Sequence, residues 1–301
     1  MTVLDTDRIS TFADADALNE LQFVAFDVET TGLSPVVARL VELSGVKFSL
    51  GSGESDTFST LIDPEMEIPA EVSQIHGITD EMVSGAPKCS QVVPEFLDWI
   101  GGERTVLVAH NAPFDVEFMQ VAIDRCQKAR PANFVLDTLP FSRAVLPQSP
   151  DHKLKTLVEY LELAAGEYHR ALADSHHVRH VLHKLLEQTT VSSWKELVDY
   201  GCVFRFDRNL YNVEPPAEIA AFITELNEAI RSGSSVSFVY SGYRTFRRTV
   251  DPVAVIQSRG TYYLSAYCRK ALAERTFRVD KMSQVKSVEL KRAPRRKEAA
   301  S

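Results

Sequence analysis

Cysteine is scarce in this chain, with four among 301 residues. The four are far apart, at Cys89, Cys126, Cys202 and Cys268, and no two of them form a Cys-x-x-Cys pair. Zinc knuckles and disulfide frameworks depend on paired or regularly spaced cysteines, so this spacing argues against both. We therefore expect reduced thiols, most of them buried.

Long hydrophobic runs are also missing. The start of the chain has no basic segment followed by an apolar run, and nowhere are there eighteen consecutive apolar residues. This pattern supports neither a signal peptide nor a membrane span, so we expect a cytoplasmic protein. The length exceeds the usual size of one domain, and 45% hydrophobic with 25% charged residues is ordinary for soluble proteins. One sizeable core plus a second module is therefore expected.

The net charge of −8 conceals an asymmetry between the two parts of the chain. Residues 1–216 hold 17 Lys and Arg against 33 Asp and Glu, whereas residues 217–301 hold 16 against 8. The two parts therefore carry −16 and +8. A basic module joined to an acidic body favours polyanion binding by the basic part, because its cations release counterions from phosphates. The alternative is a basic surface without a ligand.

The order of predicted elements indicates the α/β class. Three strand-like stretches form an antiparallel meander, and helices then alternate with two short apolar strands, which predicts a mixed sheet flanked by helices. The expected strands are 23–26, 40–48, 56–62, 106–108 and 134–136, and the expected helices are 90–101, 114–128, 138–145, 153–164 and 171–188.

The second module is predicted to be rich in β-structure. Residues 20–190 are assigned to the first domain, and a linker at 191–216 ends in two prolines that discourage helix continuation. Residues 217–290 then contain one helix and a run of strands, with Arg259-Gly260 as a hairpin turn. The last segment, 291–301, is predicted to be a basic disordered tail. The helix is 217–231, and the strands are 235–241, 246–257, 261–268, 275–280 and 284–290.

The strongest chemical signal is the segment Phe26-Asp-Val-Glu-Thr-Thr-Gly-Leu33 at the end of the first strand. Side chains two apart on a strand point to one face, so Asp27 and Glu29 project together. Two neighbouring carboxylates are costly unless a cation neutralises them, and hard oxygen ligands suit Mg²⁺ or Mn²⁺. The alternative for this pair alone is a strand-end acid next to a turn residue.

Two further acids follow where this fold brings side chains to the same sheet edge. Asp115 comes just after a predicted strand, and Asp174 lies at the start of the last helix of the domain. Either acid alone is explained by a helix N-terminus or by an exposed helix face. Their joint occurrence with Asp27 and Glu29 favours one acidic site.

These motifs resemble those of the DEDDh exonucleases, the superfamily of the polymerase III proofreading subunit and ribonuclease T. The resemblance covers residues 20–188 and implies an RNase H-like mixed sheet. It implies that four acids hold two Mg²⁺ or Mn²⁺ ions, that a histidine is the general base, and that three further residues touch the terminal nucleotide. The four acids are Asp27, Glu29, Asp115 and Asp174, the base is His169, and the nucleotide contacts are Thr30, Leu33 and Phe114. Imidazole suits proton transfer because it titrates near neutral pH.

The resemblance further implies 3′→5′ hydrolysis of terminal phosphodiester bonds to nucleoside 5′-monophosphates. Single-stranded DNA is the favoured partner, with RNA as the alternative, and the expected role is DNA repair or defence. Two rival hypotheses are a ligand-responsive nucleic-acid-binding regulator and a polymerase proofreading subunit. The complete catalytic set argues against the first, and the separate basic module argues against the second.

Two other features leave alternatives open. Asp137, in Leu136-Asp-Thr138, matches a habit of the same family, although it also suits a helix cap. In the last helix, His176, His180 and His183 are spaced to lie near one face, a pattern open to a transition metal. A solvated helix face is the simpler interpretation.

The basic module resembles a WYL domain, a small Sm-like β fold that binds nucleic acid or nucleotide-like ligands, which implies a bacterial origin. The resemblance rests on Arg248-Thr-Val-Asp-Pro252, Gly260-Thr-Tyr-Tyr-Leu264 and Arg275-Thr-Phe-Arg-Val-Asp-Lys281, with Tyr262 in place of the naming tryptophan. Aromatic faces stack on unpaired bases, and cations neutralise phosphates. Packing into the core is an equally good interpretation of either adjacent tyrosine. The predicted ligand-binding residues are Arg248, Tyr262, Arg275, Arg278 and Lys281.

Overall fold

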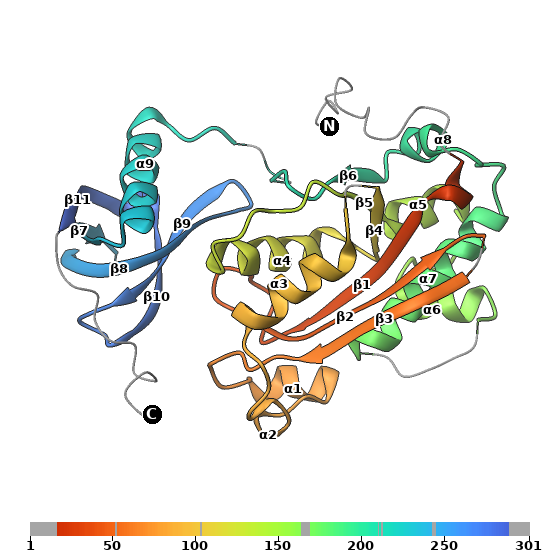
Figure 1. Cartoon of the computed structure of the whole chain (residues 1–301), viewed down its shortest axis with the longest axis horizontal. Helices are drawn as coiled ribbons and strands as arrows, with labels where there is room; N and C mark the ends of the chain where they lie inside the picture. Colours follow the sequence, from red (N-terminus) through yellow and green to blue (C-terminus); the bar gives the residue numbers. More distant parts are fainter. Residues whose placement is uncertain are drawn as a thin grey trace. The chain divides into compact units, whose positions relative to one another are not determined.

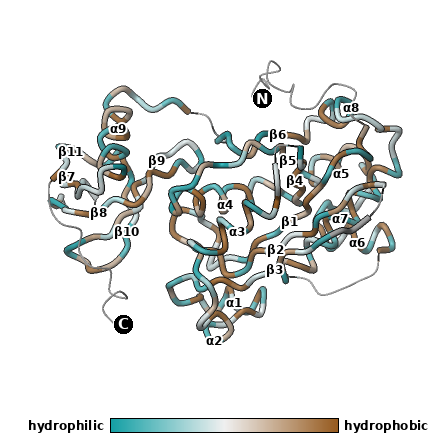
Figure 2. Tube along the Cα trace, viewed as in Figure 1, coloured by the Kyte–Doolittle hydropathy of each residue, from teal (hydrophilic) through white to brown (hydrophobic). Residues whose placement is uncertain are grey.

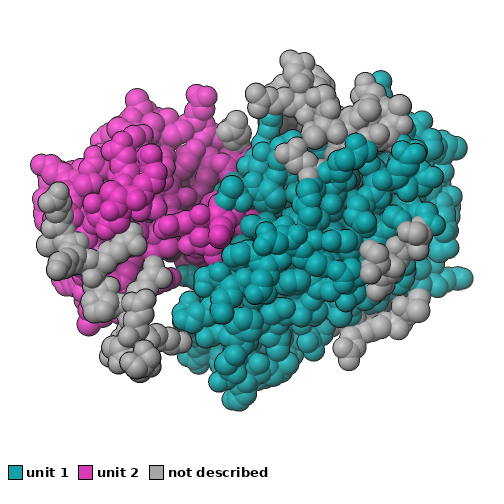
Figure 3. All heavy atoms as spheres, in the orientation of Figure 1, with its two compact units in different colours: residues 1–33, 38–122, 129–208 teal, residues 34–37, 123–128, 209–301 magenta. Residues whose placement is uncertain are grey.

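The computed structural model describes residues 17–51, 53–102, 104–163, 169–209, 211, 213–242 and 245–288. The chain divides into two compact units (Figure 3). Unit 1 comprises residues 1–33, 38–122 and 129–208, and unit 2 comprises residues 34–37, 123–128 and 209–301. The predicted basic tail at 291–301 lies outside the described residues. Among the helices of the described part, none is both long and apolar enough to cross a bilayer.

Unit 1 is built on a six-stranded mixed sheet in the order β3-β2-β1-β4-β5-β6 (Figure 1). The first three strands form the expected antiparallel meander, β4 and β5 add in parallel to β1, and β6 is antiparallel to β5. The predicted α/β class with a mixed sheet is thus confirmed. The strands are β1 (Gln22–Thr30), β2 (Leu40–Ser49), β3 (Gly53–Leu61), β4 (Thr105–Ala109), β5 (Phe134–Asp137) and β6 (Val203–Arg205).

Helices cover both faces of this sheet, which explains why β4 and β5 are apolar on both sides. Phe23 and Ala25 of β1 belong to the same core cluster as Val178 and Val181 of α7. On the opposite face, the Phe26 ring lies 6.2 Å from the Phe96 ring of α3. Alternate residues of β1 therefore face α7, the helix that begins beside the acidic residues. The main helices are α3 (Cys89–Ile100), α4 (Pro113–Arg125), α5 (Thr138–Val145), α6 (Leu154–Tyr160) and α7 (Ala171–Glu187).

Part of the predicted linker is folded into unit 1. Residues 191–216 contain α8 (Trp194–Asp199) and β6, and only the stretch after Arg208 is grouped with unit 2. Trp194 is 1% exposed, and its ring packs 5.3 Å from that of Phe134 in β5. The local sequence looked like a linker because α8 and β6 are short, whereas long-range packing against β5 stabilises them.

Two short helices were not predicted, α1 (Ala70–His76) and α2 (Asp80–Val83). Seven and four residues are too few for helicity to persist on local propensity. Tertiary burial holds them instead, since Ile78 and Val83 form a small core with Val41 of β2. α1 ends at Gly77, whose φ of 72° is a left-handed conformation that glycine adopts without strain.

Unit 2 consists of one helix on a five-stranded antiparallel sheet in the order β10-β9-β8-β7-β11. Leu226 of the helix packs with Phe238 and Leu264 of the strands, and hydrophobic colouring runs through the sheets of both units (Figure 2). Arg259 and Gly260 both have positive φ, as the predicted hairpin requires. The elements are α9 (Ala217–Ser232), β7 (Ser235–Ser241), β8 (Thr245–Ser258), β9 (Thr261–Cys268), β10 (Ala273–Arg278) and β11 (Met282–Val288).

Candidate active site

The end of β1 places two carboxylates on the face covered by α7. Asp27 and Glu29 are two residues apart on the strand, and Glu29 pairs in register with Glu42 of β2. Both side chains are half-buried. The period of the strand therefore brings the two acids together, as the sequence predicted.

A left-handed turn before α7 supplies the third acid. His169 has φ of 61°, an uncommon conformation for a residue with a side chain. Its backbone N–H donates to Asp174 Oδ2 at 3.0 Å, which ties the turn to the first turn of the helix. Carboxylate oxygens of Asp27, Glu29 and Asp174 consequently lie within 4.8 Å of one another.

Asp115 joins this group from the first turn of α4. It is 3% exposed, and its Oδ1 accepts a hydrogen bond of 3.2 Å from the Val28 N–H of β1. The loop before it turns at Asn111, where φ is 61° and the N–H donates to Asp137 Oδ1 at 2.9 Å. Asp137 also accepts from Leu139 N, so it is the helix cap of α5. All four predicted acids line one pocket.

Burial raises the pKa of every acid in this group, and repulsion from neighbouring acids adds to it for Asp27, Glu29 and Asp115. Desolvation, with repulsion from Asp174 next, raises the pKa of Glu29 to about 8. Desolvation raises the pKa of Asp115 to about 8 in spite of its hydrogen bond from Val28. The pKa of Asp27 is raised well above its usual range by burial and by Asp115, and that of Asp174 is raised mainly by burial. Four carboxylates in this position need a positive charge among them to ionise together.

The donor set fits a hard divalent cation. Asp27, Glu29 and Asp174 offer three carboxylate oxygens around one point, and Asp115 lies beside them. Oxygen-only ligands of this kind suit Mg²⁺ or Mn²⁺, and a cation in this position would lower all four pKa values. The electrostatics and the geometry therefore agree on a metal-binding role.

The raised pKa values predict that the pH dependence of stability differs with and without metal. The folded-state pKa of Glu29 and Asp115, about 8, exceeds the unfolded value near 4, so their protonated forms stabilise the metal-free fold below that lower value. This contribution is lost as pH rises through about 8. Metal-free protein should thus lose thermal stability between about pH 5 and 9, and Mg²⁺ should raise the melting temperature most at the alkaline end. Thermal melts in EDTA and in Mg²⁺ measure both, and parallel pH curves would contradict the expectation.

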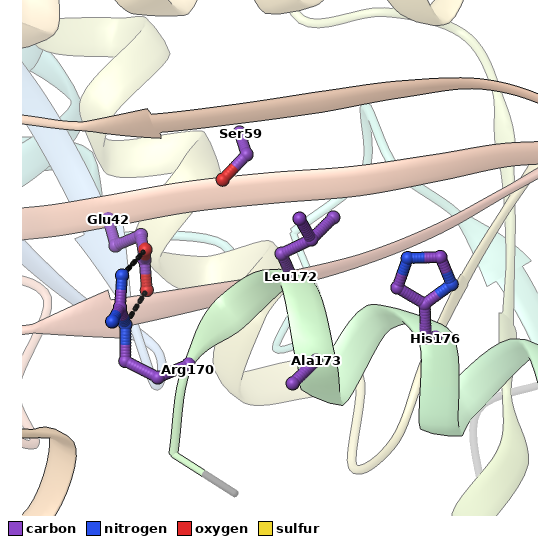
Figure 4. Close-up of a pocket in the computed structure, with 6 residues that line it drawn as sticks. All are labelled: Glu42, Ser59, Arg170, Leu172, Ala173 and His176. Carbon is purple, nitrogen blue, oxygen red and sulfur yellow. Dashed lines mark hydrogen bonds and ion pairs between the residues drawn. The ribbon is translucent and has the colours of Figure 1, made fainter. Parts of the chain in front are cut away.

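An ion pair between buried Glu42 and half-buried Arg170 fixes the start of α7. Glu42 is 2% exposed, and Arg170 donates to it through Nε at 3.3 Å and Nη2 at 2.9 Å (Figure 4). The Ala171 N–H also donates to Glu42, at 2.9 Å. The pair flanks a cavity of about 320 Å³ that Ser59 and His176 also line. The sequence analysis missed both residues, although Arg170 adjoins the predicted base. Their contact spans 128 positions of sequence and leaves no local pattern.

The pocket that holds the acids has a volume of about 670 Å³. Besides the acids and His169, it is lined by Phe114 and by several residues of the segment between β5 and α6. Thr30 and Leu33 do not line it. The Thr30 hydroxyl donates to the Gly32 carbonyl at 2.8 Å, and Leu33 is 83% exposed.

The histidines of α7 form no metal site with acids or cysteines in the part of the chain that the structure describes. His176 and His183 are half-buried and His180 is exposed, so the row is a helix face rather than a ligand cluster. His177, which interrupts the row, is 4% exposed, with Nδ1 3.5 Å from Asp174 Oδ1.

The five predicted ligand-binding residues of unit 2 are not gathered at one point. Arg248 lies over the Phe246 ring at 4.9 Å, and Arg278 makes two hydrogen bonds to Asp280, of 3.0 and 2.6 Å. Tyr262 packs on the core and its hydroxyl donates to the Val213 carbonyl at 3.2 Å, the contact expected of a packing residue. The other two, Arg275 and Lys281, are exposed. Arg275 and Arg278 are three apart on β10 and point to opposite faces.

The mixed sheet and the carboxylate cluster at the end of its first strand place this chain among α/β proteins with an acidic site that suits a metal ion. The chain belongs to the exonuclease family, whose sequence model matches residues 24–182. A WYL domain model matches residues 221–287. Both matches confirm the two resemblances found in the sequence.

Similar proteins include PolC-type DNA polymerase III enzymes. That of Oceanobacillus iheyensis is 37% identical over 171 residues, 57% of this chain and 12% of the relative. That of Listeria monocytogenes is 36% identical over 234 residues, 78% of this chain and 14% of the relative. The chain thus matches only about an eighth of the length of such relatives. The structure of E. coli exonuclease I with zinc and single-stranded DNA shares the fold, with a TM-score of 0.52 and 15% identity over 82% of this chain and 54% of that one.

Proposed function

We propose that unit 1 is a 3′→5′ exonuclease that hydrolyses the terminal phosphodiester bond and releases nucleoside 5′-monophosphates. The observation that carries the proposal is the convergence of Asp27, Glu29, Asp115 and Asp174 in one pocket, with His169 beside them. Single-stranded DNA is the favoured substrate and RNA the alternative. The similarity to an exonuclease I solved with single-stranded DNA supports this choice.

The residues of the pocket would have two roles, metal binding and proton transfer. Asp27, Glu29, Asp115 and Asp174 would hold two Mg²⁺ or Mn²⁺ ions, which supply charge for the phosphate and acidify water when bound. His169, exposed at the pocket, would take a proton from the attacking water. The hydrogen bond from its backbone N–H to Asp174 would hold the general base and the metal ligand in a fixed relative position.

Degradation of 5′-labelled single-stranded DNA with Mg²⁺ or Mn²⁺ tests this proposal. A ladder that shortens from the 3′ end, requires metal and yields nucleoside 5′-monophosphates supports it. Intact DNA and intact RNA after prolonged incubation would refute the activity. Bound but uncleaved substrate would instead favour the regulator hypothesis.

For unit 2 we propose nucleic-acid binding through Phe246 and its cations. Phe246 is 40% exposed, and Arg248 and Lys270 lie 4.9 and 5.7 Å from the centre of its ring. An exposed ring next to positive charge suits an unpaired base with its phosphate, and residues 217–301 carry the excess of basic residues. The roles of Arg275, Arg278, Lys281 and Tyr262 as ligand contacts stay predictions.

The double variant Phe246→Ala/Arg248→Gln is expected to weaken binding of a labelled single-stranded oligonucleotide about tenfold, through loss of one stacked base and one phosphate contact. Fluorescence anisotropy measures the dissociation constant. Arg231→Gln is a matched control because Arg231 is exposed at the end of α9. Equal affinity of the double variant and the control would argue for a basic surface without this ligand.

The proposed setting is DNA repair or defence in the cytoplasm of a bacterium. The 37% sequence identity with a PolC-type polymerase favours a second candidate function, which is proofreading on behalf of a polymerase. Primer extension with a mismatched 3′ end separates the two. A purified protein that removes the mismatch only when a polymerase is present would favour proofreading, and one that degrades DNA alone would favour the free-standing enzyme.

A further inference from the structure

The lining of the acidic pocket in unit 1 also includes two cations. Arg143 of α5 and Lys153, just before α6, line the same pocket as the four carboxylates. Both side chains are exposed, so both reach solvent where a polymer would enter. Neither belongs to the acidic motifs, and neither has been given a role so far.

Lys153 stands on a segment that hydrogen bonds hold in place. Burial lowers the pKa of His110 to about 4, so its ring is neutral and its Nε2–H donates to the His152 carbonyl at 2.8 Å. His110 Nδ1 then accepts from the Thr138 hydroxyl, 2.9 Å away at the start of α5. Ser142 Oγ lies 3.2 Å from His152 Nδ1. α5, the end of β4 and the residues before α6 therefore form one connected frame.

The two cations are available to an anion. Arg143 makes no hydrogen bond or ion pair with the residues that the structure describes. Its charge adds to the burial that lowers the pKa of His110 and opposes the burial that raises the pKa of Asp137. Within the described part of the chain, Lys153 has one ion pair, 3.7 Å from Asp151, and the two side chains are 82% and 46% exposed. A pair this long and this exposed contributes little and exchanges readily for a phosphate.

Charge balance indicates which phosphate of the substrate the two cations would bind. The scissile phosphate would lie at the acids, where bound metal ions would supply the neutralising charge, so it would need no side-chain cation. The next phosphates along the strand have no such partner, and the rest of residues 1–216 is strongly acidic. We propose that Arg143 and Lys153 bind the phosphates on the 5′ side of the scissile bond and hold the leaving strand. The proposal rests on the exonuclease activity of the same pocket.

Two substrates of different length test this assignment. A nitrophenyl ester of thymidine 5′-monophosphate presents the scissile bond without any upstream phosphate, whereas a labelled oligonucleotide presents several. Arg143→Gln is expected to raise KM for the oligonucleotide about tenfold, as loss of a charged hydrogen bond does, and to change kcat/KM for the ester less than about twofold. Lys153→Gln should act in the same direction, and the double variant should flatten the salt dependence.

Lys195→Gln is the matched control, because Lys195 is exposed on α8, does not line the pocket and carries the same charge. Equal losses on the ester and the oligonucleotide would overturn the proposal, as would an unchanged KM for the oligonucleotide. A wild-type protein that cleaves neither substrate would refute the proposed activity alone. Anisotropy of wild type and Arg143→Gln with the oligonucleotide would then decide the phosphate contact, and equal affinities would overturn it.

Discussion

Replacing Asp27 with Asn should reduce turnover on single-stranded DNA by at least about a thousandfold, because the variant loses a charged oxygen at the centre of the metal cluster. The same change should raise the melting temperature of the metal-free protein at about pH 8. The pKa of Asp27 is raised by burial and by four acidic neighbours, so its ionised form destabilises the fold at that pH. Nuclease assays and thermal melts in EDTA measure the two effects.

The combination of lost activity and gained stability distinguishes a functional acid from a structural one. Asp98→Asn serves as the control because Asp98 is exposed on α3, and it should alter neither property. Mg²⁺ should stabilise wild type strongly and Asp27→Asn weakly. An Asp27→Asn protein that is less stable than wild type without metal, or that keeps its rate, would show that the cluster has another role.

Replacing His169 with Ala is expected to lower turnover by about 10²- to 10⁴-fold, the usual contribution of a general base. Metal binding should stay near the wild-type level, because His169 contacts Asp174 through its backbone N–H, which alanine retains. Isothermal titration with Mn²⁺ and single-turnover cleavage measure the two quantities separately.

The left-handed backbone at His169 makes Gly an informative second variant. His169→Gly removes the same side chain without the strain of a positive φ, so it should match the Ala variant in rate and exceed it in stability. Added imidazole should restore part of the rate in both. His180→Ala, an exposed position on α7, controls for loss of a histidine. An undiminished rate in His169→Ala would refute the assigned base.

The acidic cluster was accessible from the sequence because it follows from local geometry. Asp27 and Glu29 are two residues apart on a strand, and this period alone places them on one face. Asp115 and Asp174 lie in the first turns of α4 and α7, and the motif resemblance linked them to the pair. Of the predicted nucleotide contacts, Phe114 lines the pocket and Thr30 and Leu33 do not, and all three stay predictions.

The residues that escaped prediction are held by contacts between distant parts of the chain. Glu42 and Arg170 form an ion pair 128 positions apart, and His110 reaches His152 across 42. α8 and β6 lie in a stretch that looked like a linker, and they fold because they pack on β5. No periodic pattern within a short segment indicates such contacts, because they depend on how helices and strands pack together.

The sequence by itself determined the α/β class, the strand that carries the first two acids, the motif set of an exonuclease and the presence of a basic WYL module. These properties follow from the periodicity of side chains and the spacing of motifs, and both can be recognised within short segments of the sequence. Tertiary structure alone decided how the acids raise one another's pKa, that Arg143 and Lys153 line the pocket of the acids, and that Tyr262 packs in part on the core of unit 2. Each of these depends on burial and on distances across the fold, and neither quantity exists until the chain has folded.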